Sequence, residues 1–313
     1  MKTSASPMIQ GVLGARSSRL SLASLGVLVL VASLTACGGA TSGAPAQTSS
    51  GATSTSEYGT VLGSAAAKVP ASLKDKTVTV IVPSNYPPSG YMKDGKLVGR
   101  WVDLAKEISA DTGLTFNVEP APSFDVIIPG LQAKRWDFAI PAFSVTDERR
   151  KILDFVTIAE SGTGFMVKAD SKASIKAASD VCGLKAAVQE ASVQATHAEA
   201  LNKACQESGK PAVGIQIFKS NDDAIQAIAS SRAEVLITDV GQFALIIPES
   251  NGKFRAESFV YNKSPLAIGF PKGSELAPTV HQAIKDLMDQ GVYQKIMEKY
   301  NSAADFRDPQ LLQ

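Results

Sequence analysis

The chain has 313 residues and a formal net charge of +1, with 44% hydrophobic and 19% charged residues. That is enough apolar material for a large core, in one domain or in two. Charges are balanced, and no basic segment is interleaved with aromatic residues, so we do not expect nucleic acid to be a partner.

The first 36 residues have the layout of a secretory signal. Their only charges are three cations, Lys2, Arg16 and Arg19. An apolar run of about 15 residues follows, which is shorter than the roughly 20 residues that a membrane-spanning helix needs. Residues 34–37 read LTAC, which resembles the lipobox of bacterial lipoproteins. That resemblance implies a signal peptide over 1–36, cleavage before Cys37, and a lipid on the Cys37 thiol that fastens the chain to a membrane surface.

A flexible tether is predicted over residues 37–68. This segment consists mainly of Gly, Ala, Ser, Thr and Pro, and such a composition buries too little apolar surface to order itself. Loss of the signal also removes three cations and no anion, so the formal charge of the mature chain falls from +1 to −2. We expect the tether to hold a folded domain near the membrane while leaving it free to tumble.

Alternating strands and helices are predicted from residue 76 onward. β-Branched or alternating runs predict strands, and apolar residues with helical spacing predict helices. Strands are expected at 77–82, 114–119, 136–142, 162–170, 184–189, 213–218, 233–239 and 266–270. Helices are expected at 102–113, 125–135, 192–206, 222–230, 240–247, 275–289 and 291–300, with Gly113 and Gly291 ending or breaking them.

This order predicts an α/β fold with mostly parallel sheets. One doubly wound domain is possible, but two runs of similar length suit two lobes with a cleft between them. Ligands of such sheets bind beyond the carboxyl ends of the strands. That rule points to Tyr86, Ala142–Ser144, Gln189–Val193 and Asp239.

Two cysteines remain once Cys37 is acylated. Outside the cytoplasm, a pair such as Cys182 and Cys205 predicts a disulfide, with two buried free thiols as the alternative. The only histidines are His197 and His281, each alone on a predicted helix without a neighbour at ligand spacing, so we expect no metal site and no cofactor.

Arg149 has two interpretations. Thr146 is a good N-cap for a short helix, and Asp147 and Glu148 suit the positive end of its dipole, so the segment can be a helix start alone. Alternatively, the Ser144 hydroxyl and the Arg149 guanidinium form a fork for a carboxylate. Asp239 ends a predicted strand and either caps the next helix or accepts from an ammonium group. Together these residues would clamp a zwitterion such as an α-amino acid.

Several segments then resemble one known family. They are IIPGLQAKRWDFAIPAFSVTDERRKILDF, GRWVDLAKEI, AIASSRAEVLITD, LAIGFPKGSEL and DQGVYQKIMEKY. In order and over about residues 76 to 301, they are similar to the family 3 extracellular solute-binding proteins, the polar amino-acid receptors of ABC importers.

The resemblance implies a periplasmic-binding-protein-like fold in which two α/β lobes are joined by two hinge crossings, near 159–163 and 262–266. Lobe 1 would comprise 69–159 and 267–301, lobe 2 would comprise 164–262, and 302–313 would form a C-terminal tail. It implies that Arg149 and Ser144 hold the ligand carboxylate, and that Asp239 and the Ala142 carbonyl hold its ammonium. Tyr86 and Phe124 would form aromatic walls, Ser192 and Val193 would reach the carboxylate from lobe 2, and Gln189 and Thr238 would lie beside the ligand side chain. Tyr86 and Phe124 could instead belong to the core.

Departures from the family pattern bear on the ligand. No acid stands at 83–85, just past the first strand, which argues against lysine, arginine and ornithine. Glu190 lies near the expected cleft mouth and argues against an acidic ligand, and Arg100 and Trp101 replace the usual Phe-Asp.

We therefore expect a monomeric, lipid-anchored binding protein on the outer face of the bacterial cytoplasmic membrane. It would capture a small molecule, an amino acid or close analogue that is not basic, by lobe closure and deliver it to an ABC permease. The alternatives are a dehydratase-like enzyme on the same fold and a ligand-sensing module. No nucleophile with a paired base is apparent, so we do not expect an enzyme.

Overall fold

The computed structural model describes residues 56–302, 306 and 308–313. Residues 50–313 form one compact unit, which contains the four hydrophobic clusters of the described chain and its disulfide. The predicted signal peptide and Cys37 lie outside the described residues. No helix in the described ranges is long and apolar enough to cross a membrane.

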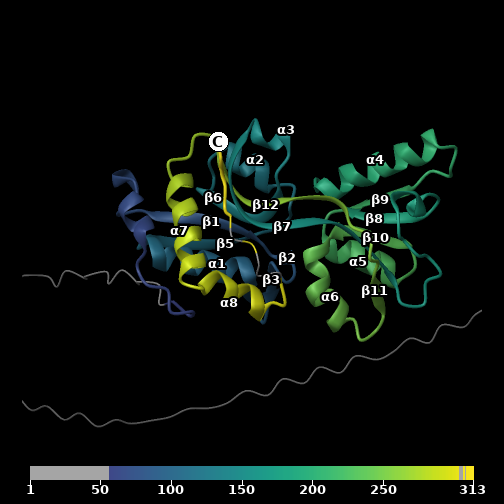
Figure 1. Ribbon diagram of the computed structural model, residues 1–313, viewed down its shortest axis with the longest axis horizontal. Helices are drawn as coiled ribbons and strands as arrows, with labels where there is room; N and C mark the ends of the chain where they lie inside the picture. Colours follow the sequence, from purple (N-terminus) through teal and green to yellow (C-terminus); the bar gives the residue numbers. More distant parts are fainter. Residues whose placement is uncertain (1–55, 303–305, 307) are drawn as a thin grey trace, which may run out of the picture. The chain divides into compact units, whose positions relative to one another are not determined.

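The first lobe is built on a parallel arrangement in which β1 lies between β5 and β6 (Figure 1). Its core forms where α1, α7 and α8 pack on these strands, with Trp101, Phe138 and Tyr293 wholly buried. The elements are β1 (Thr77–Pro83), α1 (Arg100–Thr112), β5 (Thr115–Ala121), α2 (Ile127–Gln132), β6 (Phe138–Ser144), α3 (Asp147–Arg150), α7 (Ala277–Asp289) and α8 (Val292–Lys299).

The second lobe has its own core around Phe165, Val188 and Ile237. Strand β8 lies between β10 and β9 and runs parallel to both. The elements are η3 (Ala178–Val181), β8 (Lys185–Gln189), α4 (Val193–Glu207), β9 (Gly214–Phe218), α5 (Asn221–Ala229), β10 (Val235–Asp239), η4 (Val240–Gln242), α6 (Phe243–Glu249) and β11 (Phe254–Ala256).

Two long antiparallel strands connect the lobes: β7 (Leu153–Lys168) and β12 (Tyr261–Pro271) (Figure 1). Strand β12 pairs with β6 of the first lobe, and the far end of β7 pairs with β10 of the second. The sequence patterns predicted strands only at 162–170 and 266–270. Exposed Glu160 and the Ser161–Gly162 pair interrupt the apolar pattern, whereas pairing between β7 and β12 continues through them.

A small antiparallel sheet was not predicted. It consists of β2 (Asn85–Tyr86), β3 (Gly90–Lys93) and β4 (Lys96–Val98), which are too short to give a periodic pattern. Gly90 packs against the end of β1, where a Cβ would stand 2.2 Å from the Pro83 carbonyl oxygen. This close approach fixes the loop that carries Tyr86 beyond the first strand.

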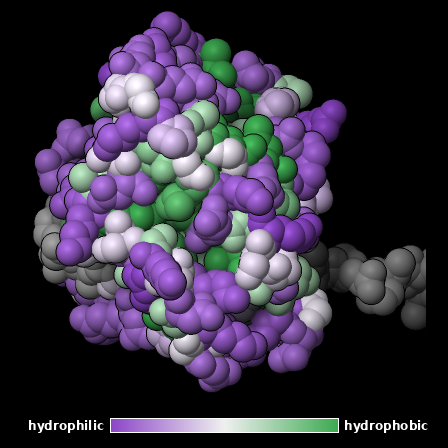
Figure 2. All heavy atoms as spheres, turned by 90° about the vertical axis from the view of Figure 1, so that its right-hand side faces the viewer, coloured by the Kyte–Doolittle hydropathy of each residue, from purple (hydrophilic) through white to green (hydrophobic). Residues whose placement is uncertain are grey.

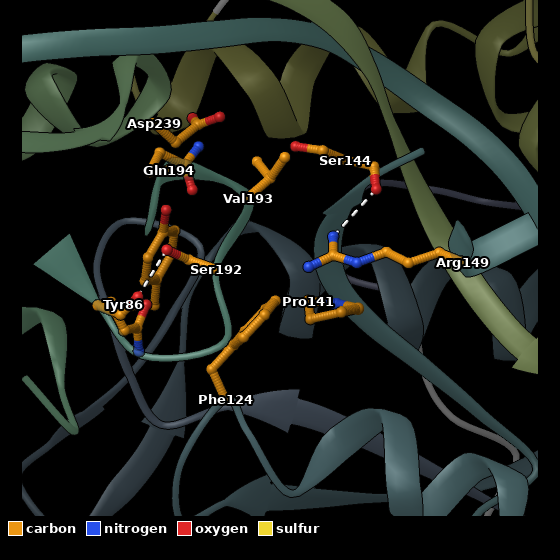
Figure 3. A pocket seen from close by; sticks show the side chains of 10 residues that line it. Tyr86, Phe124, Pro141, Ser144, Arg149, Ser192, Val193, Gln194 and Asp239 are labelled. Atoms are coloured by element: carbon orange, nitrogen blue, oxygen red, sulfur yellow. Dashed lines mark hydrogen bonds between the residues drawn. The ribbon is translucent and has the colours of Figure 1, made fainter. Parts of the chain in front are cut away.

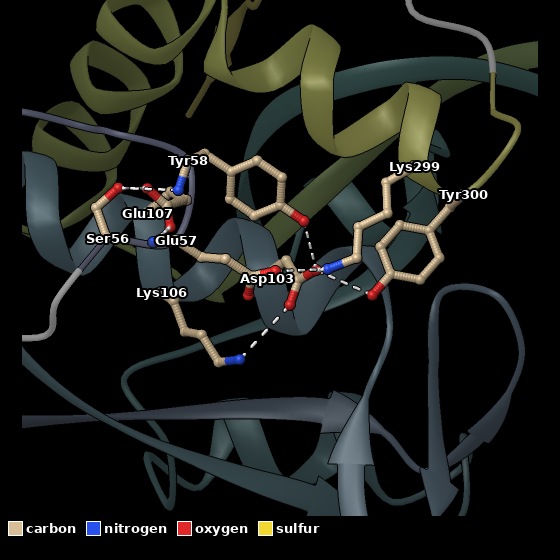
Figure 4. A network of polar contacts seen from close by, with 8 residues as sticks. All are labelled: Ser56, Glu57, Tyr58, Asp103, Lys106, Glu107, Lys299 and Tyr300. Atoms are coloured by element: carbon tan, nitrogen blue, oxygen red, sulfur yellow. Dashed lines mark hydrogen bonds and ion pairs between the residues drawn. The ribbon is translucent and has the colours of Figure 1, made fainter.

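Residues 56–68 differ from the predicted tether because they contact the first lobe. Glu107 is wholly buried on α1 and accepts hydrogen bonds from Ser56 Oγ at 2.6 Å and from the Glu57 amide at 3.0 Å. Tyr58 Oη donates to Asp103 Oδ2 at 2.8 Å, as do Lys299 Nζ at 2.8 Å and Tyr300 Oη at 2.9 Å (Figure 4). A short 3₁₀ helix, η1 (Ser64–Lys68), then packs against α1 and α7. Buried carboxylates that need partners therefore order a segment whose composition alone indicates flexibility.

The C-terminal segment also differs from a free tail. Strand β13 (Leu311–Leu312) pairs with β7, and Gln310 exchanges hydrogen bonds with Thr157 at 2.7 and 2.9 Å. The predicted disulfide is confirmed: Cys182 is bonded to Cys205, with their Cα atoms 5.6 Å apart. It ties the end of η3, just before β8, to the last turn of α4 in the second lobe.

Seen from the side of the second lobe, the surface is mostly hydrophilic, with hydrophobic residues between the polar ones (Figure 2). Among the described residues of this lobe, Ile217 on the edge strand β9 is the most exposed large hydrophobic residue, at 57%.

Candidate functional site

One small cavity is lined by residues of both lobes. It is lined by Tyr86, Phe124, Pro141, Ser144 and Arg149 of the first lobe and Gln189, Ser192, Val193, Gln194 and Asp239 of the second (Figure 3). Its volume is about 20 Å³. A cavity of that size holds about one water molecule. A space of this size is too small for a ligand with several non-hydrogen atoms.

The Arg149 guanidinium reaches across the gap between the lobes. Nη1 donates to the Ser144 carbonyl oxygen at 3.0 Å, and Nη2 donates to the Ala191 carbonyl oxygen of the second lobe at 3.2 Å. Burial lowers the pKa of Arg149 from 12.5 to about 10, and no nearby carboxylate counteracts this lowering. A half-buried cation bonded to two neutral carbonyls leaves its charge uncompensated, which favours an anion at this place.

The helix-start interpretation of the Arg149 segment is confirmed, and the carboxylate fork stays a prediction. Thr146 caps α3, because its side chain accepts the Arg149 amide at 3.2 Å, and Asp147 and Glu148 occupy the first turn. The backbone of Arg149 thus belongs to a capped helix start, while its side chain points toward Ser144 and the cavity (Figure 3).

Aromatic rings border the guanidinium. Arg149 Cζ lies 5.9 Å from the ring centroid of Phe124 and 5.5 Å from that of Phe143. Phe124 and Phe143 meet edge to face with centroids 5.7 Å apart, so Phe124 lines the cavity and also packs on the core. Burial raises the pKa of Tyr86 and keeps its hydroxyl neutral.

The second lobe contributes the turn between β8 and α4. Ser192 caps α4: its Oγ accepts from the Ala195 amide at 3.1 Å and donates to the Gln189 carbonyl at 2.6 Å. Ala191 has a φ of +57°, a left-handed value that a non-glycine residue adopts at a cost. Gln189 is 5% exposed, and its Nε2 has no hydrogen-bond partner within the described residues. This donor is available to a ligand in the cavity.

Asp239 lies at the end of β10, as its position in the sequence predicted. It caps η4 by accepting from the Gly241 amide at 2.8 Å, so the capping interpretation is confirmed, while its role as an acceptor for an ammonium stays a prediction. Burial raises the pKa of Asp239, while the nearby Ser161 side chain and the charge of Arg100 oppose that shift. The carboxylate is 5% exposed and lines the cavity.

Thr238, one of the predicted site residues, is not among the side chains that line the cavity in the described structure. Thr238 directs its hydroxyl to Asn221 Oδ1 and Gln242 Oε1, both at 3.2 Å, because it sits on the opposite face of β10 from its neighbour. Ala142 lies within β6, and its expected contact through the carbonyl stays a prediction. Pro141 and Gln194 line the cavity but were missed, since neither a strand proline nor a helix glutamine gives a signal in the sequence.

Other candidate groups are engaged elsewhere. His197 Nδ1 lies 2.7 Å from Thr163 Oγ1, and His281 Nε2 lies 2.9 Å from the Pro309 carbonyl oxygen. Glu190 pairs with Lys219, which offsets its charge. Within the described ranges, no group of histidine, cysteine and acidic side chains is placed to hold a metal ion.

Comparison with known proteins now decides the family. The model of the bacterial extracellular solute-binding proteins, family 3, matches residues 78–303. The chain belongs to this family. It is 28% identical over 229 residues to the arginine-binding protein ArgT of Corynebacterium glutamicum, covering 72% of this chain and 75% of that protein.

Solved structures of related proteins share the fold. An ancestral arginine-binding protein bound to glutamine matches with a TM-score of 0.65 and 30% identity, over 72% of this chain and 98% of that one. An ancestral amino acid-binding protein, a precursor of cyclohexadienyl dehydratase, matches with a TM-score of 0.64 and 27% identity, over 72% and 95%. The predicted periplasmic-binding fold with two α/β lobes is thereby confirmed.

Proposed function

We propose that this member of the family binds an α-amino acid or a close analogue between its lobes. The observation that supports this most is the Arg149 guanidinium, which lies in the inter-lobe cavity with two neutral carbonyls as partners. A ligand carboxylate would accept its two donors as a fork. Asp239 on the other lobe would then accept the ligand ammonium. The relatives named above are themselves named as amino-acid-binding proteins.

The ligand side chain is proposed to be uncharged. Asp239 is the one acidic residue among the side chains that line the cavity in the described structure, and the ammonium group would occupy it. A basic side chain would find no second carboxylate there. The unpartnered Gln189 Nε2 and the neutral Tyr86 hydroxyl suit a polar, neutral group or an apolar one.

Binding is proposed to work by closure of the lobes about β7 and β12, with hinges near 159–163 and 262–266. In the structure Arg149 donates to Ala191 of the opposite lobe, a contact that a bound carboxylate would replace. The ligand then supplies the cross-lobe bonds, and its differential affinity for the closed form drives the change.

The wider role follows from the N-terminal sequence and the family. We propose that Cys37 carries a lipid outside the cytoplasm and that the monomeric domain delivers its ligand to an ABC permease. An enzymatic role is the second candidate, because a dehydratase precursor is among the similar structures. The residues lining the cavity include no histidine, cysteine or lysine, and the Ser192 hydroxyl donates to the Gln189 carbonyl rather than to a base.

Calorimetry of residues 50–313 against the twenty amino acids tests the proposal, since this compact unit contains the whole cavity. We expect a neutral amino acid to bind at micromolar or lower concentration and arginine and lysine to bind at least about a hundredfold more weakly. Tightest binding of arginine or lysine would refute the neutral side chain, and absence of any binding would refute the amino-acid assignment.

A further inference from the structure

Arg100 is a buried cation in an unfavourable position. It is the first residue of α1, it is 4% exposed, and it follows Gly99, which has a φ of +133°. Both burial and the positive end of the helix dipole oppose a positive charge there. A cation kept in such a place needs an anion close by.

The direct hydrogen-bond partners of Arg100 are neutral. Nη1 donates to Ser302 Oγ at 2.5 Å and Nη2 donates to Ser89 Oγ at 3.0 Å. Its Nε has no hydrogen-bond partner in the described chain. Arg100 is also absent from the ion pairs of the described residues, which include those of Lys299, Lys272 and Lys219.

Among the described residues, the buried carboxylate that borders the same space as Arg100 is Asp239, on the opposite lobe. A methyl group at Gly241 would stand 2.8 Å from Asp239 Oδ1 and 3.1 Å from Arg100 Nη2, so both charged groups border the same small space. A second cavity of about 220 Å³ is lined by both residues, by Ser161 and Gly241, and by Glu160, which is exposed to solvent whereas Asp239 is buried. Burial lowers the pKa of Arg100, and among the charged groups that counteract this lowering Asp239 has the largest effect.

Asp239 thus lies between two sites for a cation. It lines the ligand cavity on one side, with Tyr86 and Arg149, and the second cavity on the other, with Arg100. A ligand ammonium at Asp239 would share one carboxylate with the permanent charge of Arg100. Two cations on one buried anion repel each other at close range, where the dielectric screening of water is reduced.

We propose that Arg100 is a specificity-determining residue: by sharing Asp239 it weakens the amine half of the clamp, so that recognition rests mainly on the ligand carboxylate. This inference depends on the proposed function. Its consequence is a binding protein that accepts 2-hydroxy acids nearly as well as the matching α-amino acids. A purely structural role for Arg100 would change the affinity for both ligand classes by the same factor.

The test compares each L-amino acid with its 2-hydroxy acid, in which a hydroxyl replaces the ammonium. Affinities are measured by calorimetry at pH 7 on residues 50–313, for the wild type and for Arg100→Gln. The measured quantity is the preference ratio, the Kd of the hydroxy acid divided by the Kd of the amino acid. We expect Arg100→Gln to raise this ratio at least about tenfold through tighter binding of the amino acid.

Two further variants separate charge from shape. Arg100→Lys keeps the charge and should keep the wild-type ratio, whereas the exposed Arg135→Gln on the same lobe removes a distant charge and should change nothing. A rise of less than tenfold in Arg100→Gln, or an equal rise in Arg100→Lys, would overturn the proposal.

The wild type gives an answer even if Arg100→Gln does not fold. A wild-type preference below about a hundredfold supports shared use of Asp239, and a larger preference contradicts it, since an unshared buried ion pair is worth more than that. If neither ligand class binds at all, the proposed function fails together with this inference. If amino acids bind and the ratio is insensitive to Arg100, this inference alone fails.

Discussion

Replacement of Arg149 by methionine should separate ligand binding from stability. Methionine keeps an unbranched side chain of similar length and removes the charge and both donors. The proposed ligand carboxylate would lose two charge-assisted hydrogen bonds, from Nη1 and Nη2, which now go to Ser144 and Ala191. Together they are worth about 3–5 kcal/mol, so the affinity should fall between about 10²-fold and several thousandfold.

The stability of the ligand-free protein should change little. Burial lowers the pKa of Arg149 to about 10. The charged side chain therefore destabilises the folded state, by about 2 kcal/mol once its partial exposure is taken into account. Loss of the two hydrogen bonds to carbonyls removes a similar amount of stabilisation. These terms offset each other, so we expect the melting temperature to remain within about 4 °C of the wild-type value.

Calorimetry with the ligand found in the amino-acid panel and thermal unfolding without it provide the measurements. Arg150→Met, at the exposed neighbouring position, serves as the control and should retain both affinity and stability. Retained affinity in Arg149→Met would contradict the carboxylate clamp. A loss of stability above about 3 kcal/mol would instead show that Arg149 is a structural cross-link between the lobes.

Three further outcomes are expected. Replacing Cys182 and Cys205 by alanine should lower the free energy of unfolding by about 3 kcal/mol and leave the affinity unchanged, as measured by denaturant titration; equal stability would contradict a constraining role for the bond. Asp111→Asn should be more stable than the wild type above pH 7, and the difference should vanish toward pH 4. Burial and Asp286 raise the Asp111 pKa from 3.8 to about 7. Between these two pH values the folded state binds a proton at Asp111 that the unfolded state has lost, so the stability of the wild type falls as the pH rises. A melting-temperature difference between the variant and the wild type that does not depend on pH would refute this explanation. A chain that begins at Lys68 should melt at least several degrees lower with unchanged affinity, because buried Glu107 loses its partners Ser56 and Glu57; an unchanged melting temperature would show that the segment 56–67 contributes nothing.

Local signals predicted most elements correctly. Apolar periodicity gave α1, α4, α5, α7 and α8 to within a few residues, and Gly113 and Gly291 adopt the left-handed conformation expected at a helix end and a helix break. The signals failed where pairing partners are distant in sequence. Strand β7 continues through Glu160 and Ser161 because these residues pair with Pro265 and Ser264 of β12.

The sequence alone determined the family, the α/β order of elements and the residues just past the strand ends, because each depends on local periodicity and on short motifs. Tertiary structure decided which of those residues meet. Alternation along β10 directs Asp239 into the cavity and Thr238 away from it. The structure alone placed Arg100 beside Asp239, residues that lie on different lobes and far apart in the sequence. Charges in water are screened within about 10 Å, so their pairing becomes visible only when folding brings them together in a space from which water is excluded.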